Sequence, residues 1–188
     1  LNVVAFPDVI FRSGGGFSTK SAALFGQATW EIMPSLEVTG GLRYTYEKKK
    51  YDTLNNQQVI GVLVDPVNRI FLDFREAPIP FVTGSTPDLQ TNEVTPHFNI
   101  AYHWSPSVMT YFSYSKGYKS GGYEQRLAPG TPAVPSFRPE YVNSYELGLK
   151  ASIPDAGLAI GASAFHSKYR DMQISVVDGP SPTLTNAG

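Results

Sequence analysis

The residues of this sequence best suited to bind a metal ion are two histidines, His97 and His103. Both fall on one parity of an alternating segment, so their side chains are predicted to share one face of a strand. They are six residues apart, which along a strand is about 20 Å, and one ion cannot bridge that distance. We therefore favour ordinary hydrogen bonding for both histidines and predict no metal site and no cofactor.

Two further stretches resemble catalytic motifs but lack required residues. Residues 113–117 (SYSKG) do not match the nucleophile elbow, and residues 14–16 (GGG) do not complete a phosphate-binding loop. The chain has no cysteine, which excludes a thiol nucleophile and a disulfide scaffold. We identify no catalytic constellation and predict that the chain is not an enzyme. The net charge of -1 gives no reason to propose a nucleic-acid partner.

The clearest structural signal is the strict alternation of residues 36–47. One parity is apolar or aromatic: Leu36, Val38, Gly40, Leu42, Tyr44 and Tyr46. The other is polar apart from Gly41: Glu37, Thr39, Arg43, Thr45 and Glu47. A strand points alternate side chains to opposite faces, so one face is predicted to be apolar and the other polar and in contact with water. A strand of this length rises about 40 Å, or roughly 28 Å of height at a 45° tilt, which matches the hydrocarbon layer of a bilayer.

Six segments alternate in this way. They cover about 21–32, 36–48, 92–104, 108–119, 142–153 and 158–174. Phe25 on the polar parity and Lys116 on the apolar parity are exceptions. In the sixth segment, His166, Lys168 and Arg170 continue the parity that begins apolar, which predicts either a bulge or a change of environment there.

The connections between these segments alternate in size. Those at 33–35, 105–107 and 154–157 are short, whereas those at about 49–91 and 120–141 are long. This asymmetry predicts an all-β antiparallel meander of about six long strands in a transmembrane barrel, with short periplasmic turns and long extracellular loops. Inside the first long loop, Val59–Val64 and Arg69–Phe74 are predicted to form a hairpin above the membrane.

Aromatic residues are predicted to mark both ends of the membrane span. Trp30 and Trp104 are the only tryptophans, and both lie on the apolar parity just before a short turn. Tyr44 and Tyr46 lie at the opposite end, so the four would form two girdles. The alternative is that these rings cap a sandwich core. The run Lys48-Lys49-Lys50 could contact anionic lipopolysaccharide, although we favour a solvated strand end.

The composition fits a β protein whose surface carries few charges, but several classes of β protein share this property. Aromatic residues make up 13% and charged residues only 16% of the chain, where about 25% charged is typical. No apolar run approaches the roughly 18 residues of a transmembrane helix. A passive porin, an autotransporter wall and a soluble β-sandwich or carbohydrate-binding module remain open. The sequence begins and ends abruptly, which we interpret as a piece of a longer protein.

Three stretches resemble a known family, the TonB-dependent outer-membrane receptors. They are SAALFGQATWEIMPSLEVTGGLRYTYEKKKYD, TPHFNIAYHWSPSVMTYFSYSKGYKSGGY and FRPEYVNSYELGLKASIPDAGLAIGASAFHSKYRDMQIS. Together they cover all six alternating segments. The resemblance implies a place in the wall of a 22-stranded barrel that encloses a plug domain in the bacterial outer membrane. It also implies uptake of a scarce nutrient, most often a ferric siderophore, with energy relayed through TonB.

On this interpretation the chain is about a quarter of the wall, and its plug domain and TonB-contact motif lie elsewhere. Its expected partners are outer-membrane lipid and lipopolysaccharide, its own plug domain, TonB and a small ligand such as a ferric siderophore. Six strands cannot close a barrel, so we do not expect transport by this segment alone. Glu31, Glu37, Arg43 and Glu146 would belong to a polar inner wall in contact with the plug or water.

Substrate contacts, if the segment makes any, are predicted in the second long loop and the adjacent wall. The candidates are Tyr118, Lys119, Tyr123, Arg126, Phe137 and Arg138. Aromatic and arginine side chains suit an anionic or aromatic chelate. The same residues could equally pack the loop against the wall.

Overall fold

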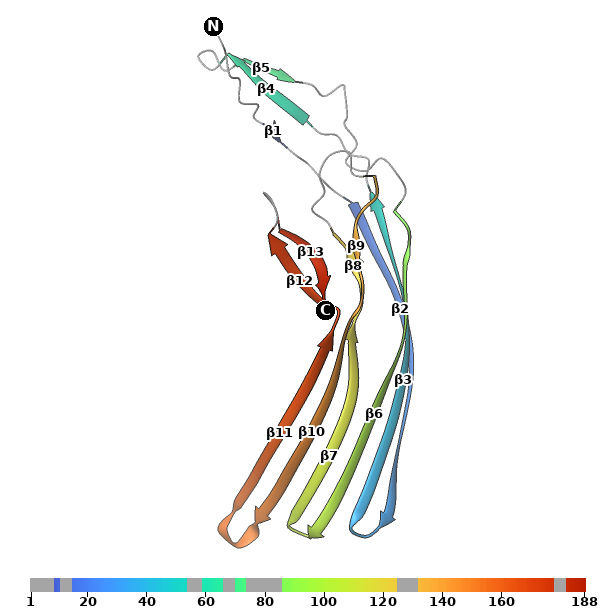
Figure 1. The fold of residues 1–188 in the computed structure, drawn as a ribbon, viewed down its shortest axis with the longest axis vertical. Coiled ribbons are helices and arrows are strands. Elements are labelled where there is room, and N and C mark those ends of the chain that lie inside the picture. The colour runs from blue at the N-terminus through green and yellow to red at the C-terminus, as the bar shows by residue number, and fades with distance from the viewer. Residues whose placement is uncertain are drawn as a thin grey trace.

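The computed structural model describes residues 9–10, 15–53, 59–65, 70–73, 86–124, 132–177 and 182–188. Its main element is a six-stranded antiparallel sheet (Figure 1). The strands are β2 (Gly15–Met33), β3 (Leu36–Thr53), β6 (Leu89–Ser105), β7 (Val108–Lys119), β10 (Glu140–Ile153) and β11 (Leu158–Arg170). Their order across the sheet is β11-β10-β7-β6-β3-β2, which is the predicted meander.

The connections at one end of this sheet are short, as predicted, and all three lie together at the foot of the molecule (Figure 1). Two are two-residue turns, at 34–35 and 106–107. The third is a single 3₁₀ turn, Pro154–Ala156, followed by Gly157 at φ 61°. Glycine suits that position because the left-handed region costs it nothing.

Smaller strand pairs extend from the opposite end. β4 (Val59–Asp65) pairs with β5 (Ile70–Asp73) and with β1 (Val9–Ile10). The β4–β5 pairing bears out the predicted hairpin as far as it is described, while Arg69, Phe74 and the turn lie outside the described residues. In the second loop β8 (Gly122–Tyr123) pairs with β9 (Ser136–Phe137). After β11, β12 (Met172–Val177) pairs with β13 (Pro182–Ala187).

The strand register places the apolar parities of all six strands on one face. Residues directly opposite each other in antiparallel strands project to the same side. One such row joins Gly40, Phe98, Tyr114, Tyr145 and His166, and the next joins Val38, Ile100, Phe112, Leu147 and Ala164. We call this side the apolar face and the other the polar face.

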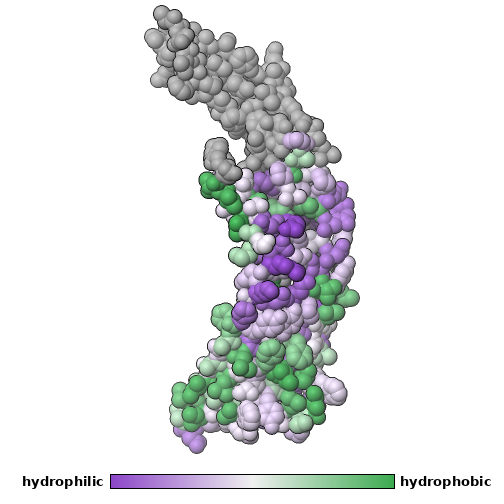
Figure 2. All heavy atoms as spheres, viewed as in Figure 1, coloured by the Kyte–Doolittle hydropathy of each residue, from purple (hydrophilic) through white to green (hydrophobic). Residues whose placement is uncertain are grey.

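The large side chains of the apolar face are exposed. Leu24 is 78%, Trp30 70% and Leu147 62% exposed, and Figure 2 shows apolar residues gathered over the lower part of the sheet, with hydrophilic ones above them. A soluble sandwich would cover such residues with a second sheet, and none lies on them among the described residues. The described part of the chain thus lacks the second layer that the sandwich alternative requires.

The predicted sixth strand, 158–174, is corrected at its C-terminal end. It ends at Arg170, because Asp171 has φ 55°, a left-handed conformation that turns the chain out of the ladder. Of the two possibilities predicted for this strand, the bulge is absent: β10 and β11 pair without a register shift from Tyr141 and Arg170 down to Ile153 and Leu158. The basic residues of this strand do project from the apolar face, so the other possibility, a change of environment, is the one left.

The sheet divides in its upper part. The ladder between β6 and β7 ends at His97 and Ser115, beside Pro96, which has no N–H to donate. Above this point β6 continues to pair with β3, and β7 with β10. The polar side chain of Glu93 spans the division, accepting hydrogen bonds from Lys116 at 3.2 Å and from the Tyr141 hydroxyl.

No helix among the described residues has the length and hydropathy needed to cross a membrane.

Candidate functional site

The polar face carries hydrogen-bonded side chains. His103 lies 3.6 Å from the Glu37 carboxylate, whereas His97 stands opposite Ser115 in another row. Arg43 donates to the Thr45 hydroxyl at 3.2 Å. No group of three or more His, Asp or Glu residues in the described part of the chain is placed to hold a metal ion.

The best-organised polar region is the second long loop where it folds against the upper wall, and Tyr123 is its centre. Tyr123 is only 5% exposed. Its hydroxyl lies 2.7 Å from the Pro87 carbonyl and 3.1 Å from the Lys49 carbonyl, and it accepts a hydrogen bond from the Leu89 N–H at 3.0 Å. Its ring packs against Tyr51, with 5.7 Å between centroids. Burial raises the pKa of this phenol above its ordinary value.

Lys49 fastens the same loop to the wall from β3. Its ammonium donates to the Ser120 hydroxyl at 2.6 Å and to the Gly121 carbonyl at 2.7 Å. It also pairs with Glu47 at 3.1 Å. Below these contacts, an open hollow of about 280 Å³ is lined by Ser21, Arg43, Thr45, Glu47, Tyr118 and Ser120. This hollow places a guanidinium, a carboxylate and a phenol within one solvent-accessible pocket.

Gln173, a residue that the sequence did not single out, closes the other side of the loop. Its side-chain amide donates to the carbonyls of Ser120 at 3.0 Å and Arg138 at 3.1 Å. Its own N–H donates to the Glu140 carboxylate at 3.0 Å. Asn186 also donates to the Arg138 carbonyl, at 3.0 Å. The only sequence signal for Gln173 was its place in the third stretch of the resemblance.

Of the six predicted substrate contacts, the structure describes five. Tyr118 is half-buried at the hollow, Lys119 and Arg138 are exposed, and Arg138 pairs with Asp171 at 2.7 Å. Phe137 is half-buried and packs on Gly122. Tyr123 packs the loop, as the alternative interpretation held. Arg126 lies outside the described residues, and substrate contact by any of the six stays a prediction.

Gly121 and Gly122 permit this loop to close on itself. A Cβ built on Gly121 would overlap the Phe137 carbonyl oxygen, and one on Gly122 would lie 2.6 Å from the Phe137 ring. Gly121→Val is therefore expected to displace the 136–139 segment by at least an ångström or two, at a cost of about 1–3 kcal/mol in loop stability. Limited proteolysis of the whole protein should show faster cleavage near residue 137. Gly26→Val, at a position with open space, is the matched control, and equal cleavage of the two would contradict the expectation.

The ion pair between the half-buried Lys48 of β3 and the exposed Asp88 gives a pH prediction. Lys48 donates to Asp88 at 2.8 Å, and this hydrogen bond holds the pKa of Asp88 below its ordinary value. A lowered carboxyl pKa means that the pair contributes above the unfolded pKa of about 3.9 and is lost as the pH falls through the lowered folded value. NMR titration of the Asp88 carboxyl should show that Lys48→Gln raises the midpoint, while Lys49→Gln does not. An unchanged midpoint in Lys48→Gln would refute the assignment.

The predicted girdle residues all lie on the apolar face. Trp30 and Trp104 are 70% and 67% exposed near the short turns, and Tyr44 is 46% exposed toward the loop end. Tyr46 is half-buried beyond it. The Trp104 indole donates to Thr110 at 3.1 Å, and the Tyr44 hydroxyl to Asn92 at 3.1 Å. The Trp104 and Tyr44 rings thus each combine a hydrogen-bonded polar atom with an exposed apolar surface, and the membrane girdle stays a prediction.

A long antiparallel meander with one bare apolar face, one polar face, short turns at one end and long loops at the other defines a segment of a membrane β-barrel wall. The chain belongs to the family of TonB dependent receptor-like β-barrels, whose sequence model matches residues 3–188. This membership excludes the porin and autotransporter alternatives. Proteins of this family reside in the outer membrane, and the family is one of transport receptors.

Individual relatives agree with this membership. The chain is 24% identical over 183 residues to the pesticin receptors of Yersinia enterocolitica and Yersinia pestis, covering 97% of this chain and 24% of each relative. The ferric yersiniabactin uptake receptor FyuA from Yersinia pestis superposes with a TM-score of 0.65 at 21% identity, over 94% of this chain and 23% of that one. The alcaligin outer-membrane receptor FauA from Bordetella pertussis gives a TM-score of 0.56 at 16% identity, over 92% and 25%. The chain therefore spans about a quarter of the length of these relatives.

Proposed function

We propose that this chain is part of the wall and outer vestibule of a receptor that takes up a ferric siderophore across the bacterial outer membrane, with energy relayed through TonB. The observation that carries the proposal is the six-stranded family wall, because the relatives named above are receptors for ferric yersiniabactin and alcaligin. The other strands of the barrel, the plug domain and the TonB contact belong to the rest of the whole protein.

The two edges of the sheet support the proposal that further strands of the barrel belong to the rest of the protein. β2 and β11 have no further strand beyond them among the described residues. Unpaired strand edges are not tolerated in lipid, so neighbouring strands must complete them in a membrane. The loop around Tyr123 packs against the upper end of β3. The hollow beside Arg43 and Tyr118 offers cationic and phenolic groups to an iron chelate.

The test is uptake by the whole receptor in its own cell. A strain that lacks the gene is grown under iron limitation, and radioactive iron uptake is measured with ferric yersiniabactin, ferric alcaligin and the strain's own ferric siderophores. We expect the mutant strain to lose uptake of one of these chelates. Returning the gene should restore that uptake, and removing TonB should abolish it again. Unchanged uptake of every chelate, with loss of cobalamin or glycan uptake instead, would overturn the siderophore assignment.

A further inference from the structure

The upper part of the sheet is split between two interior strands. The ladder of β6 and β7 ends at the pair His97 and Ser115, although residues 89–96 of β6 and 116–119 of β7 continue as strands above it. There β6 stays paired with β3, and β7 with β10. We call this split the seam. It divides the upper sheet into a β2–β3–β6 ribbon and a β7–β10–β11 ribbon.

The carboxylate of Glu93 crosses the seam. It accepts hydrogen bonds from the Lys116 ammonium at 3.2 Å and from the Tyr141 hydroxyl, and the Glu93 side chain is only 13% exposed. The Lys116 ammonium also lies 5.1 Å from the centre of the Tyr141 ring. Side-chain contacts thus stand where backbone ladder bonds would otherwise join two strands. Because each ribbon keeps its own ladder, these contacts can break without the loss of a ladder bond.

The two ribbons are rotated relative to each other at the seam. Glu93 stands opposite Thr45 and belongs to the polar face, whereas Lys116 and Tyr141 share the parity of the apolar face. In a flat, continuous sheet these side chains would project to opposite sides. Strands twist, and a ladder that is interrupted beside Pro96 no longer holds its two strands at one angle. The β7–β10–β11 ribbon has therefore turned part of its apolar parity toward the polar face of β6.

The hollow described above lies across this seam. One side of its lining comes from β2 and β3, and the other from the end of β7 and the residue that follows it. These residues are Ser21, Arg43, Thr45 and Glu47 on the first side, and Tyr118 and Ser120 on the second. The width of the hollow therefore depends on how far apart the two ribbons stand. Thr45, on the floor between them, is only 6% exposed.

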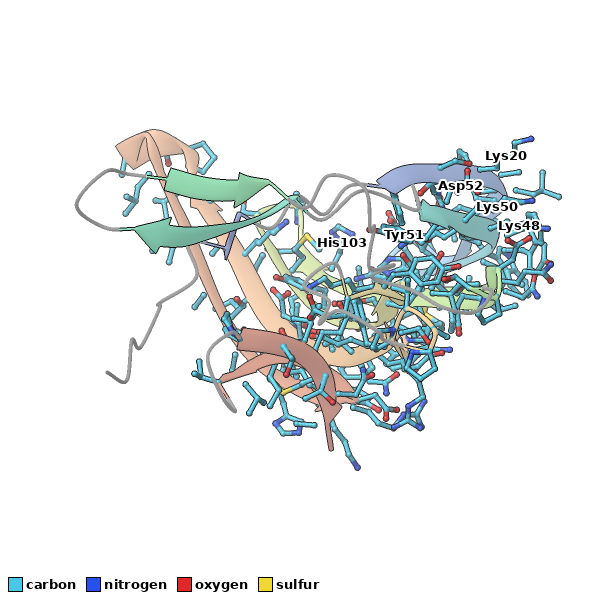
Figure 3. All side chains as sticks on the ribbon, turned by 90° about the horizontal axis from the view of Figure 1, so that it is seen from above. Lys20, Lys48, Lys50, Tyr51, Asp52 and His103 are labelled. Atoms are coloured by element: carbon cyan, nitrogen blue, oxygen red, sulfur yellow. The ribbon has the colours of Figure 1, made fainter. Side chains whose placement is uncertain are left out.

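The second long loop makes a further closure, farther from the short turns. The Tyr123 hydroxyl accepts a hydrogen bond from the Leu89 N–H of β6, and the Tyr123 ring packs on Tyr51. Seen from the loop end, Tyr51 lies toward the centre of the view, whereas Lys48 and Lys50 lie at its rim (Figure 3). The loop thus closes the seam from the inner side of the sheet, and the carboxylate contact closes it within the wall.

We propose that the seam is a gate to the hollow and that Glu93 is the latch that keeps this gate shut. The proposal rests on the proposed function only for the identity of the ligand. When the contacts of Glu93 break, the β7–β10–β11 ribbon swings about the pair His97 and Ser115 and carries Tyr118 away from Arg43. The hollow then widens and admits a chelate, and the returning ribbon closes over it.

The experiment measures how fast a single buried cysteine is modified. This chain has no cysteine of its own, so Thr45→Cys in the whole receptor, freed of any other cysteine, reports the opening of the hollow to a thiol reagent. Hydrogen bonds to a charged group are strong enough that Glu93→Ala should raise the modification rate about tenfold or more. Tyr141→Phe, which removes one of the two hydrogen bonds and keeps the ring, should raise it less. This milder variant keeps the test usable if Glu93→Ala does not fold.

Two controls separate the gate from general loosening. Ala101→Cys, at a position 5% exposed within the continuous ladders of β6, should be modified at the same rate with and without Glu93→Ala. Glu146 also accepts a hydrogen bond from a tyrosine, Tyr111, but β7 and β10 are fully paired there. Glu146→Ala should therefore leave the rate at Thr45→Cys unchanged. An unchanged rate at Thr45→Cys in Glu93→Ala, or an equal rise at Ala101→Cys, would overturn the latch.

The ligand is tested separately, with ferric yersiniabactin and ferric alcaligin as probes. A chelate that occupies the hollow should protect Thr45→Cys from modification, and Glu93→Ala should raise the association and dissociation rates of that chelate together. A destabilised wall would lower binding without speeding association. Wild-type rates of binding in Glu93→Ala would overturn the gate. If neither chelate binds the wild type, the siderophore assignment of the proposed function fails, while the modification rates still decide the latch.

Discussion

Leu147→Arg is expected to lower the free energy of unfolding of the whole receptor in lipid by about 2–4 kcal/mol. Leu147 is 62% exposed on the apolar face, between Phe112 and Ala164 on the neighbouring strands. No charged residue stands in its row across the sheet, and a guanidinium there must be moved out of water into hydrocarbon. Urea titration of the receptor folded in vesicles measures the change.

The matched control is Asn99→Arg, which lies at a similar height on the polar face. Polar side chains there face the watery interior, so the expected change is within about 1 kcal/mol. If the two substitutions cost the same, the assignment of the apolar face to lipid is wrong. If Asn99→Arg alone is costly, the faces are reversed.

Tyr123→Ala is expected to release the second loop from the wall at a cost of about 3–5 kcal/mol in local stability. The ring fills the space between Tyr51 and Phe17, and the hydroxyl engages three backbone groups. Hydrogen exchange of the loop amides reports this local opening, whereas the transmembrane strands should be unaffected.

Tyr123→Phe separates the two contributions. It keeps the ring but leaves the Leu89 N–H without its acceptor, at an expected cost of about 1–3 kcal/mol. Tyr169→Phe, on a side chain that is 52% exposed, is the control and should change nothing measurable. Loop amides that exchange at wild-type rates in Tyr123→Ala would show that the loop is held by other contacts.

The strands of the wall were predictable from the sequence because, within each strand, apolar residues that face lipid alternate with polar residues that face water. The alternation of Leu42 with Arg43, or of Leu147 with Glu146, needs no knowledge of neighbouring strands. The same logic failed at the end of the sixth strand. There the left-handed Asp171 turns the chain before residue 174, and aspartate marks such a turn only weakly.

The loop contacts were not predictable, because they join residues far apart in the chain without a period. Tyr123 was singled out for its chemistry, and nothing local indicated that Lys49, Pro87 and Leu89 would surround its hydroxyl. The contribution of Gln173 depends on carbonyls of residues 120 and 138, which no spacing rule brings together. Nothing in the sequence around Gly121 and Gly122 indicated their close approach to Phe137.

The three consecutive lysines of β3 meet two different surroundings in succession, because neighbouring side chains point to opposite sides. A single residue inserted into the middle of this strand would send every side chain beyond it to the wrong side, presenting arginine to lipid and leucine to water. Two inserted residues would restore the sides but shift the pairing. Length variation among related proteins should therefore accumulate in the connections, where side chains need not alternate with a two-residue period. The strands should diverge by substitution alone.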